Sequence, residues 1–260
     1  MDVLKQNSIA WDKKVEDGGN YTRPVSSETI EKSRAGDFEI GVTAGRMVPR
    51  HWFPKILSGL KVLCLASGGG QQGPVLAAAG ADVTVVDLSL KQLEQDQYVA
   101  KRDGLTLQTI QGSMSDLHFF EDESFDLIVH PVSNVFVENV LPVWKEASRV
   151  LKDKGILIAG ITNPLLYIFD DEEEDKGNLI VKHKIPYSDL ETLTEEKLEQ
   201  YRESKRALEF GHSLEDQIQG QIDAGFVITG FYEDNFGGSR MLDHYINTFI
   251  ATRAMKIKVD

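Results

Sequence analysis

The 260-residue chain contains a single cysteine, Cys64, so no disulfide can form within one copy. It has no apolar run approaching the roughly 18 residues that a membrane-spanning helix needs. Its first residues, MDVLKQNSIAWDKK, lack the apolar stretch of a secretory signal peptide. A reducing, cytoplasmic location without membrane insertion is therefore expected.

Positive charge is scarce, because 28 lysines and arginines face 41 acidic residues and leave a formal net charge of −13. Nucleic-acid binding draws most of its affinity from Lys and Arg on phosphates, so this balance argues against a DNA or RNA partner. The six histidines are scattered and there is no C-x-x-C. That spacing argues against a structural zinc site.

Apolar segments alternate with amphipathic ones through most of the chain. Strands are expected at residues 61–67, 82–89, 105–113, 125–131, 156–162, 226–234 and 245–257. Helices are expected at residues 71–80, 90–104, 138–155 and 213–225. Strands that alternate with helices form right-handed crossover units and a parallel sheet covered on both faces. The last two strands have a short connection, which predicts an antiparallel pair. The expected fold is α/β: a three-layer, Rossmann-like, seven-stranded sheet, mostly parallel with a C-terminal antiparallel hairpin.

Two regions lie outside this alternation. Residues 1–57 are expected to form a helical or flap segment, and residues 58–260 the main domain, with a lid insertion around 165–210. Within the insertion, the acidic run 169–178 is typical of a solvated loop, and 179–189 alternates like a short strand.

The N-terminal segment divides into two parts. Residues 9–26 contain Trp, Tyr, Gly and Pro without helical periodicity, which predicts an ordered flap or a mobile terminus. SSETIEKSRAG predicts a helix that is capped by Ser26 or Ser27 and closed by Gly36.

A glycine-rich loop follows the first predicted strand in the stretch KVLCLASGGGQQG, residues 61–73. Glycines before a helix let an anionic group reach free backbone N–H groups, a geometry that NAD, FAD and S-adenosylmethionine all use. Asp87 ends the next strand, where a carboxylate can accept hydrogen bonds from ribose hydroxyls. The pair predicts an adenosine-containing cofactor. The alternatives are a tight turn for the loop and a helix cap for Asp87, a role for which Ser89 competes.

The order of these landmarks resembles the class I S-adenosylmethionine-dependent methyltransferases. The resemblance rests on VLCLASGGG, VTVVDLS, QGSMSDLHFFEDESFDLIVHPVSNVF and VWKEASRVLKDKGILIAG, and it covers about residues 58–162. It implies S-adenosylmethionine as cofactor and S-adenosylhomocysteine as product. Three positions depart from the family pattern: Cys64 and Ser113 stand where acids are usual, and Ala66 replaces the first loop glycine.

Carried over position by position, the resemblance implies that the loop passes beneath the methionine part of the cofactor. Asp87 would hold the ribose, and Leu88 and Met114 would border the adenine. The expected cofactor-binding residues are Ala66, Ser67, Gly68, Gly70, Gln71, Gln72, Asp87, Leu88, Gln92, Ser113, Met114 and His130.

His130, at the end of the fourth predicted strand, is the candidate catalytic base, because the pKa of a free histidine suits proton transfer at neutral pH. A buried histidine bonded to the backbone is the alternative, and His212 is a weaker candidate. The expected substrate-side residues are Trp11, Tyr21, Arg46, Arg50, Trp52 and Asn134. For Trp52, packing of the N-terminal segment onto the sheet is the alternative.

The sequence thus predicts an S-adenosylmethionine-dependent methyltransferase that acts on a small molecule by in-line displacement. Two alternatives stay open: a protein methyltransferase, and a cofactor-binding module that has lost catalysis, suggested by Cys64 and Ser113. A nicotinamide oxidoreductase is a third. A monomer and a homodimer are equally compatible with the sequence.

Overall fold

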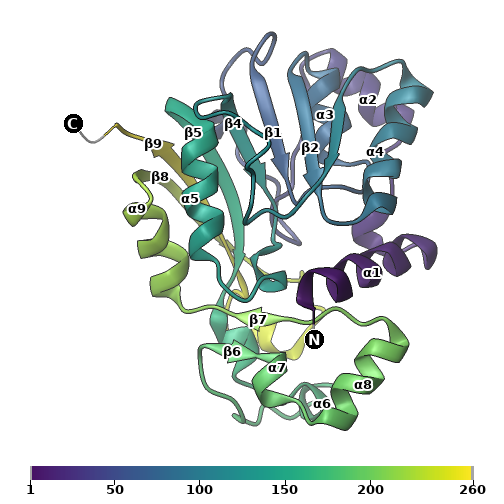
Figure 1. The fold of residues 1–260 in the computed structure, drawn as a ribbon, viewed down its shortest axis with the longest axis vertical. Coiled ribbons are helices and arrows are strands. Elements are labelled where there is room, and N and C mark those ends of the chain that lie inside the picture. The colour runs from purple at the N-terminus through teal and green to yellow at the C-terminus, as the bar shows by residue number, and fades with distance from the viewer. Residues whose placement is uncertain (1, 259–260) are drawn as a thin grey trace.

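A seven-stranded sheet forms the centre of the computed structural model, which describes residues 2–258 (Figure 1). The strands are β1 (Lys61–Leu65), β2 (Asp82–Asp87), β3 (Gln108–Gln111), β4 (Phe125–His130), β5 (Leu151–Thr162), β8 (Phe226–Asp234) and β9 (Phe249–Lys256). Their order is β3-β2-β1-β4-β5-β9-β8. The first five are parallel, and β9 pairs antiparallel with both β5 and β8. The expected fold class is confirmed.

Helices cover both faces of this sheet. They are α2 (Ser27–Arg34), α3 (Gln72–Ala78), α4 (Leu90–Asp103), α5 (Leu141–Val150) and α9 (Gly220–Asp223), the last preceded by a π-helical turn over Glu215–Gln219. Strand β1 shows the two-sided burial directly, because Val62 and Cys64 join one apolar cluster and Leu63 and Leu65 the other. Such a strand is continuously apolar, as a buried parallel strand must be. No helix between residues 2 and 258 is both long and apolar enough to cross a membrane.

The boundary between α5 and β5 differs from the prediction. The helix ends at Val150, and the strand begins at Leu151, which pairs with Phe125 of β4. The register shifts after this pair, and Lys154 takes a left-handed φ of 60°. Pairing with β4 therefore overrides the helical tendency of residues 151–155.

The first part of the predicted flap, residues 9–16, belongs instead to helix α1 (Val3–Glu16), whereas residues 17–26 contain only a 3-10 turn at Asn20–Thr22. The buried side chains of α1 are Val3, Gln6, Asn7 and Ala10, which follow helical spacing. Two of the four are polar, so the hydrophobic periodicity that would predict a helix is hidden. Helix α2 is capped by Ser26, as predicted, whose Oγ accepts a hydrogen bond from the Thr29 N–H at 3.2 Å.

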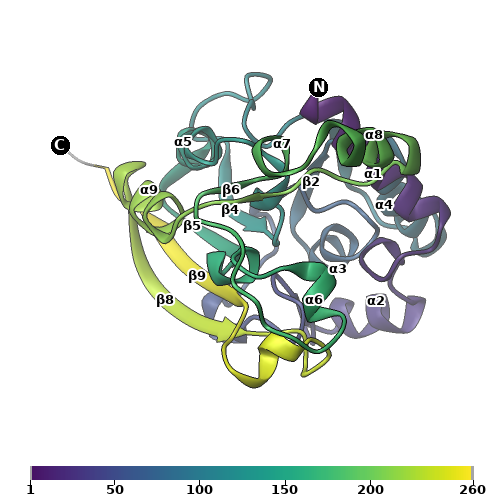
Figure 2. The same cartoon turned by 90° about the horizontal axis from the view of Figure 1, so that it is seen from below.

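A second, smaller layer lies beyond the carboxyl ends of the parallel strands (Figures 1 and 2). This lid layer, residues 165–211, contains α6 (Asp171–Glu174), β6 (Tyr187–Ser188), α7 (Asp189–Thr192), α8 (Glu195–Ser204) and β7 (Phe210–Gly211). The strand expected over 179–189 is thus reduced to two residues. The acidic run is not a wholly solvated loop either, because Glu174 is buried in an ion pair with Arg240.

Helix α1 joins the sheet to the lid layer. The Asn7 side-chain amide donates to the backbone oxygen of Phe136, near the sheet, at 3.0 Å and to that of Leu208, in the lid layer, at 3.1 Å. The Leu208 N–H returns a hydrogen bond to Asn7 Oδ1 at 2.8 Å. Ser8 Oγ donates to the backbone oxygen of Leu88 at 3.1 Å. The position of the lid layer over the sheet therefore depends on α1.

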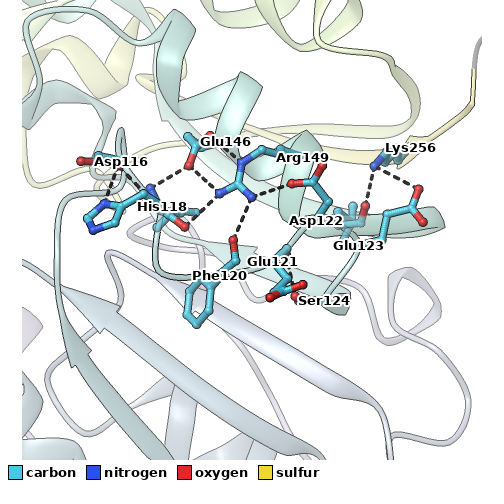
Figure 3. Close-up of polar contacts among 12 residues, drawn as sticks. Asp116, His118, Phe120, Glu121, Asp122, Glu123, Ser124, Glu146, Arg149 and Lys256 are labelled. Carbon is cyan, nitrogen blue, oxygen red and sulfur yellow. Dashed lines mark hydrogen bonds and ion pairs between the residues drawn. The ribbon is translucent and has the colours of Figure 1, made fainter.

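The loop between β3 and β4 is fastened to α5 by Arg149 (Figure 3). The guanidinium donates to the backbone oxygens of Leu117 and Phe120, both at 2.9 Å, and forms ion pairs with Glu146 and Asp122. Glu146 also accepts from the Leu117 N–H at 2.7 Å. Because two of its partners are backbone oxygens, Arg149 fixes the path of the loop.

Replacing Arg149 with Met should therefore lower the free energy of unfolding by about 2–3 kcal/mol, because charge-assisted hydrogen bonds to the loop are lost. Urea unfolding measures this change. Arg202→Met is the matched control, since its ion pair with Glu199 is exposed on α8 and surface pairs contribute little. Equal effects of the two substitutions would show that Arg149 does not hold the loop.

Candidate functional site

A cavity of about 740 Å³ lies at the carboxyl ends of the parallel strands, between the sheet, α1 and the lid layer. Parallel α/β sheets bind their ligands at this edge. Ten of the twelve predicted cofactor-binding residues line it: Ala66, Ser67, Gly68, Gln71, Gln72, Asp87, Leu88, Gln92, Ser113 and Met114. Gly70 and His130 are not among the lining residues.

The glycine loop needs its glycines for reasons beyond a tight turn. A Cβ atom on Gly68 would lie 2.7 Å from the Cβ of Gln92 and 3.1 Å from an Asp87 carboxylate oxygen. Gly69 and Gly70 have φ values of 114° and 73°, which side chains rarely tolerate. Ala66, where the family has glycine, also takes a left-handed φ of 49°. Ala66 therefore takes a backbone conformation that glycine adopts more readily.

Asp87 ends β2 directly beneath this loop. Its Oδ2 accepts from the Gly68 N–H and its Oδ1 from the Ser89 N–H, both at 2.9 Å. Ser89 is itself the cap of α4, accepting from the Gln92 N–H at 3.1 Å. Asp87 is therefore free of the capping role and faces the cavity, where burial raises the pKa of its carboxyl to about 6.

A second buried carboxylate, Asp96 of α4, is a residue that the sequence analysis missed. Its Oδ2 accepts from the Gly69 N–H at 3.0 Å. Burial, together with the nearby charge of Asp87, raises the pKa of Asp96 to about 8. Cys64, where the family has an acid, is close enough for the charge of Asp96 to raise the pKa of its thiol. Asp96 thus places an acidic side chain from α4 against the glycine loop, near Cys64.

Two buried side-chain oxygens near the glycine loop, Asp96 Oδ1 and Gln92 Oε1, have no hydrogen-bond partner among the described residues, and Gln92 lines the cavity. Gln92 Oε1 is buried and takes no hydrogen bond from any residue between 2 and 258. A buried acceptor without a partner is costly unless a ligand supplies the donor. With the Asp87 carboxylate and the apolar walls of Leu88 and Met114, this oxygen fits a hydroxyl-bearing adenosine group.

His130 is fully buried and does not reach the cavity. Its Nδ1 lies 2.9 Å from the backbone oxygen of Leu65, and its Nε2 lies 2.8 Å from Oδ1 of Asn134. The Asn134 amide donates onward to Gln217 at 3.0 Å. Burial lowers the pKa of His130, which keeps the ring neutral. His212 is buried as well, with its Nε2 2.9 Å from the Asn134 backbone oxygen. These contacts agree with the alternative of a buried, hydrogen-bonded histidine.

Two of the six predicted substrate-side residues, Trp11 and Tyr21, line the cavity. The Trp11 ring meets Phe136 edge-on, with centroids 5.2 Å apart, and Lys14 Nζ lies 4.1 Å from the centre of the same ring. Helix α1 therefore contributes part of the cavity wall. Asn134 does not line it, because it belongs to the His130 network.

The other three predicted substrate-side residues are not among the residues that line the cavity, although Ala44 and Met47, on either side of Arg46, are. Trp52 is buried against Tyr232, with ring centroids 5.3 Å apart, and Arg46 lies over the same tyrosine at 4.5 Å. Arg50 lies over Phe38 at 4.4 Å. The packing alternative for Trp52 is therefore the arrangement observed.

The far end of the cavity is formed by residues that the sequence analysis did not identify. Tyr167 OH donates to Glu209 Oε2 at 2.9 Å, and both residues line the cavity. They are 42 positions apart in the lid layer and belong to no recognisable motif. Only the folded chain shows that they meet.

Comparisons with known proteins give a consistent result. Residues 63–159 match the model of a methyltransferase domain. An uncharacterized methyltransferase, YbaJ, of Bacillus subtilis is 62% identical over 255 residues, 98% of this chain and 99% of that protein. The ubiquinone biosynthesis O-methyltransferase of Haemophilus ducreyi is 32% identical over 114 residues, which are 42% of this chain and 48% of that protein.

Solved structures agree at the level of fold. The S-adenosylmethionine-dependent methyltransferase of Mesorhizobium loti has a TM-score of 0.60 at 16% identity, over 80% of this chain and 95% of its own. A methyltransferase of Methanosarcina mazei has a TM-score of 0.54 at 18% identity, and the match covers 80% of this chain and 96% of that protein.

The role of Asp96 in holding the glycine loop can be tested by measuring the free energy of unfolding of two variants. Its pKa of about 8 means that the folded protein favours the neutral acid at pH 7, so Asp96→Asn should leave unfolding nearly unchanged. Asp96→Ala should cost about 1–3 kcal/mol, because the Gly69 N–H loses its acceptor. Urea unfolding at pH 7 separates the two.

The same pKa sets a pH dependence. The pKa of Asp96 is about 4 in the unfolded chain and about 8 in the folded protein. The folded state therefore binds the proton more tightly, and the stability that Asp96 contributes is lost as the pH rises from about 4 to about 8. The wild-type protein should therefore lose stability between pH 5 and pH 9 relative to Asp96→Asn. Parallel pH profiles for the two proteins would contradict this assignment.

Proposed function

The chain belongs to the class I S-adenosylmethionine-dependent methyltransferase superfamily, and from this premise we propose that it methylates a small molecule inside the cavity. S-Adenosylmethionine supplies a methyl group already activated by its sulfonium. The protein then has to bind, orient and exclude water. The oxygens of Asp87 and Gln92 would bind ribose hydroxyls. Ser67, Gly68 and the helix beginning at Gln72 would hold the methionine part, and Ser113 and Met114 would border the adenine.

The observation that carries the small-molecule acceptor is the continuity of the cavity. The residues at its two ends, Asp87 by the glycine loop and Glu209 in the lid layer, line one space. A volume of about 740 Å³ lies within the range typical of small-molecule sites. Helix α1 and the lid layer cover this space, whereas a protein substrate needs an open groove. The hydrogen bond from the Gly69 N–H to Asp96 also weakens the case for a degenerate module, because an acid near Cys64 still holds the glycine loop. The cytoplasmic location remains a prediction.

Calorimetric titration tests the cofactor directly. S-Adenosylmethionine and S-adenosylhomocysteine should bind, and NADH should not. Asp87→Ala should weaken binding by about 1–3 kcal/mol, because the ribose hydroxyls lose their acceptor. Asp82→Ala, at the exposed start of the same strand, is the control and should bind normally. Binding that is unchanged in Asp87→Ala would remove the ribose assignment.

The affinity should also depend on pH. Hydroxyl donors favour the ionised form of Asp87, so cofactor binding must displace its proton below the pKa of about 6. We expect the dissociation constant of S-adenosylhomocysteine to rise about tenfold per pH unit below pH 6 and to level off above it. Asp87→Asn should bind more weakly with no such slope. A wild-type profile that is flat between pH 4.5 and pH 7 would refute this expectation.

A further inference from the structure

We propose that the lid end of the cavity binds a neutral aromatic acceptor through its hydroxyl group, and that Glu209, oriented by Tyr167, accepts the hydroxyl proton. This inference rests on the proposed function, because it names the acceptor class and the base for the same methyl transfer. His130, the base expected from sequence, is outside the cavity, so the position of proton acceptor is open.

The geometry of Glu209 leaves one carboxylate oxygen for a ligand. The residue directly precedes β7, and its backbone N–H donates to Asp189 Oδ2 at 2.8 Å, which fixes the main chain. Tyr167 OH occupies Oε2 at 2.9 Å. Oε1 accepts no hydrogen bond from any described residue, although the side chain lines the cavity. An acceptor hydroxyl could therefore donate to Oε1.

The charges around Glu209 favour a neutral donor. Arg240, the cavity-lining arginine at this end, is taken up by an ion pair with the buried Glu174. Lys14 Nζ lies 4.1 Å from the centre of the Trp11 ring, and its charge lowers the pKa of Glu209 without a direct ion pair. The charges that act on Glu209 are those of Asp189, Lys14 and Arg206, so two carboxylates face two cations and a neutral ligand is favoured. Burial also raises the pKa of Glu209, which makes it a better proton acceptor.

The walls at this end are aromatic. Trp11 and Phe136 form one edge-to-face pair, and Phe236 and Phe249 form another with centroids 4.6 Å apart. Tyr167 is stacked on Tyr187 at 5.3 Å with an interplanar angle of 21°, which holds its hydroxyl toward Glu209. Rings favour edge-on or offset contacts with other rings. These walls therefore suit a ring-bearing acceptor, and Glu209 Oε1 suits its hydroxyl.

The proposed step balances as follows. The hydroxyl proton passes to Glu209 Oε1, and an electron pair of the acceptor oxygen forms the new bond to the methyl carbon. The bond between this carbon and sulfur breaks, and its electron pair remains on sulfur, which leaves neutral S-adenosylhomocysteine. The proton leaves Glu209 for water after product release. No oxidant, metal or further co-reactant is needed.

The test uses catechol as the probe and the full chain saturated with S-adenosylhomocysteine, so that binding is measured without turnover. Calorimetry should show catechol binding to the wild type and at least tenfold weaker binding to Glu209→Gln. Glu203→Gln, the same change on the exposed surface of α8, should bind catechol as the wild type does. Veratrole, which has the ring but no hydroxyl, should bind wild type and Glu209→Gln alike. With S-adenosylmethionine, formation of methylated catechol should fall 10²–10⁴-fold in Glu209→Gln, in the range usual for a general base.

Each outcome has a definite meaning. If S-adenosylhomocysteine does not bind, the proposed function fails first. If it binds but catechol does not, or if catechol binds Glu209→Gln and the wild type equally, the acceptor inference alone is overturned. Should Glu209→Gln fail to fold, Tyr167→Phe replaces it. That variant frees Oε2 from its partner and should also weaken catechol binding, and unchanged affinity would again overturn the inference.

Discussion

The hydrogen bonds between buried carboxylates and the amides of the glycine loop are the constraint on which the site depends. Asp87 reaches Gly68 from the end of β2, and Asp96 reaches Gly69 from α4. Two elements that are adjacent in sequence thus hold one loop from two directions. Carboxylates buried this deeply are costly, as the raised pKa values of both show. The amide donors offset part of that cost, and they leave the loop with a single backbone path that a ligand does not have to impose.

The second constraint is polar as well. Asn7 bonds both the segment after β4 and the segment before β7, so one side chain sets the distance between sheet and lid layer. Two layers joined only by apolar contacts could shift past each other. The three hydrogen bonds of the Asn7 amide group have fixed geometry and would break if the lid layer moved relative to the sheet. These hydrogen bonds therefore help to set the separation of the two layers, and with it the cavity between them. This explains how a lid layer with only a two-stranded ladder can still present Tyr167 and Glu209 at fixed positions.

The sheet and the cofactor end of the cavity could be predicted from sequence, because short stretches of neighbouring residues indicate both. The apolar run of β1, the glycines at 68–70 and Asp87 lie close together in the chain, and each has a direct physical meaning. Helix α1 could not be predicted, since its buried face includes Gln6 and Asn7, whose partners are some 200 positions away. The choice between the two interpretations of His130 could not be made from sequence, because the end of a parallel strand predicts nearness to the site but not the direction of a side chain. Glu209 and Tyr167 carry no local signal and meet only through the fold.

Helix α1 has a consequence for both ends of the cavity. Trp11 lies on the wall of the cavity, and Asp12, one residue on, accepts a hydrogen bond from Ser89 Oγ next to Asp87. The helix ends at Glu16, just before Gly18, which has a left-handed φ of 68°. One helix therefore touches the cofactor end of the cavity through Asp12 and Ser89 and the lid layer through Asn7. A substitution that displaces α1 would alter the binding of both ligands at once.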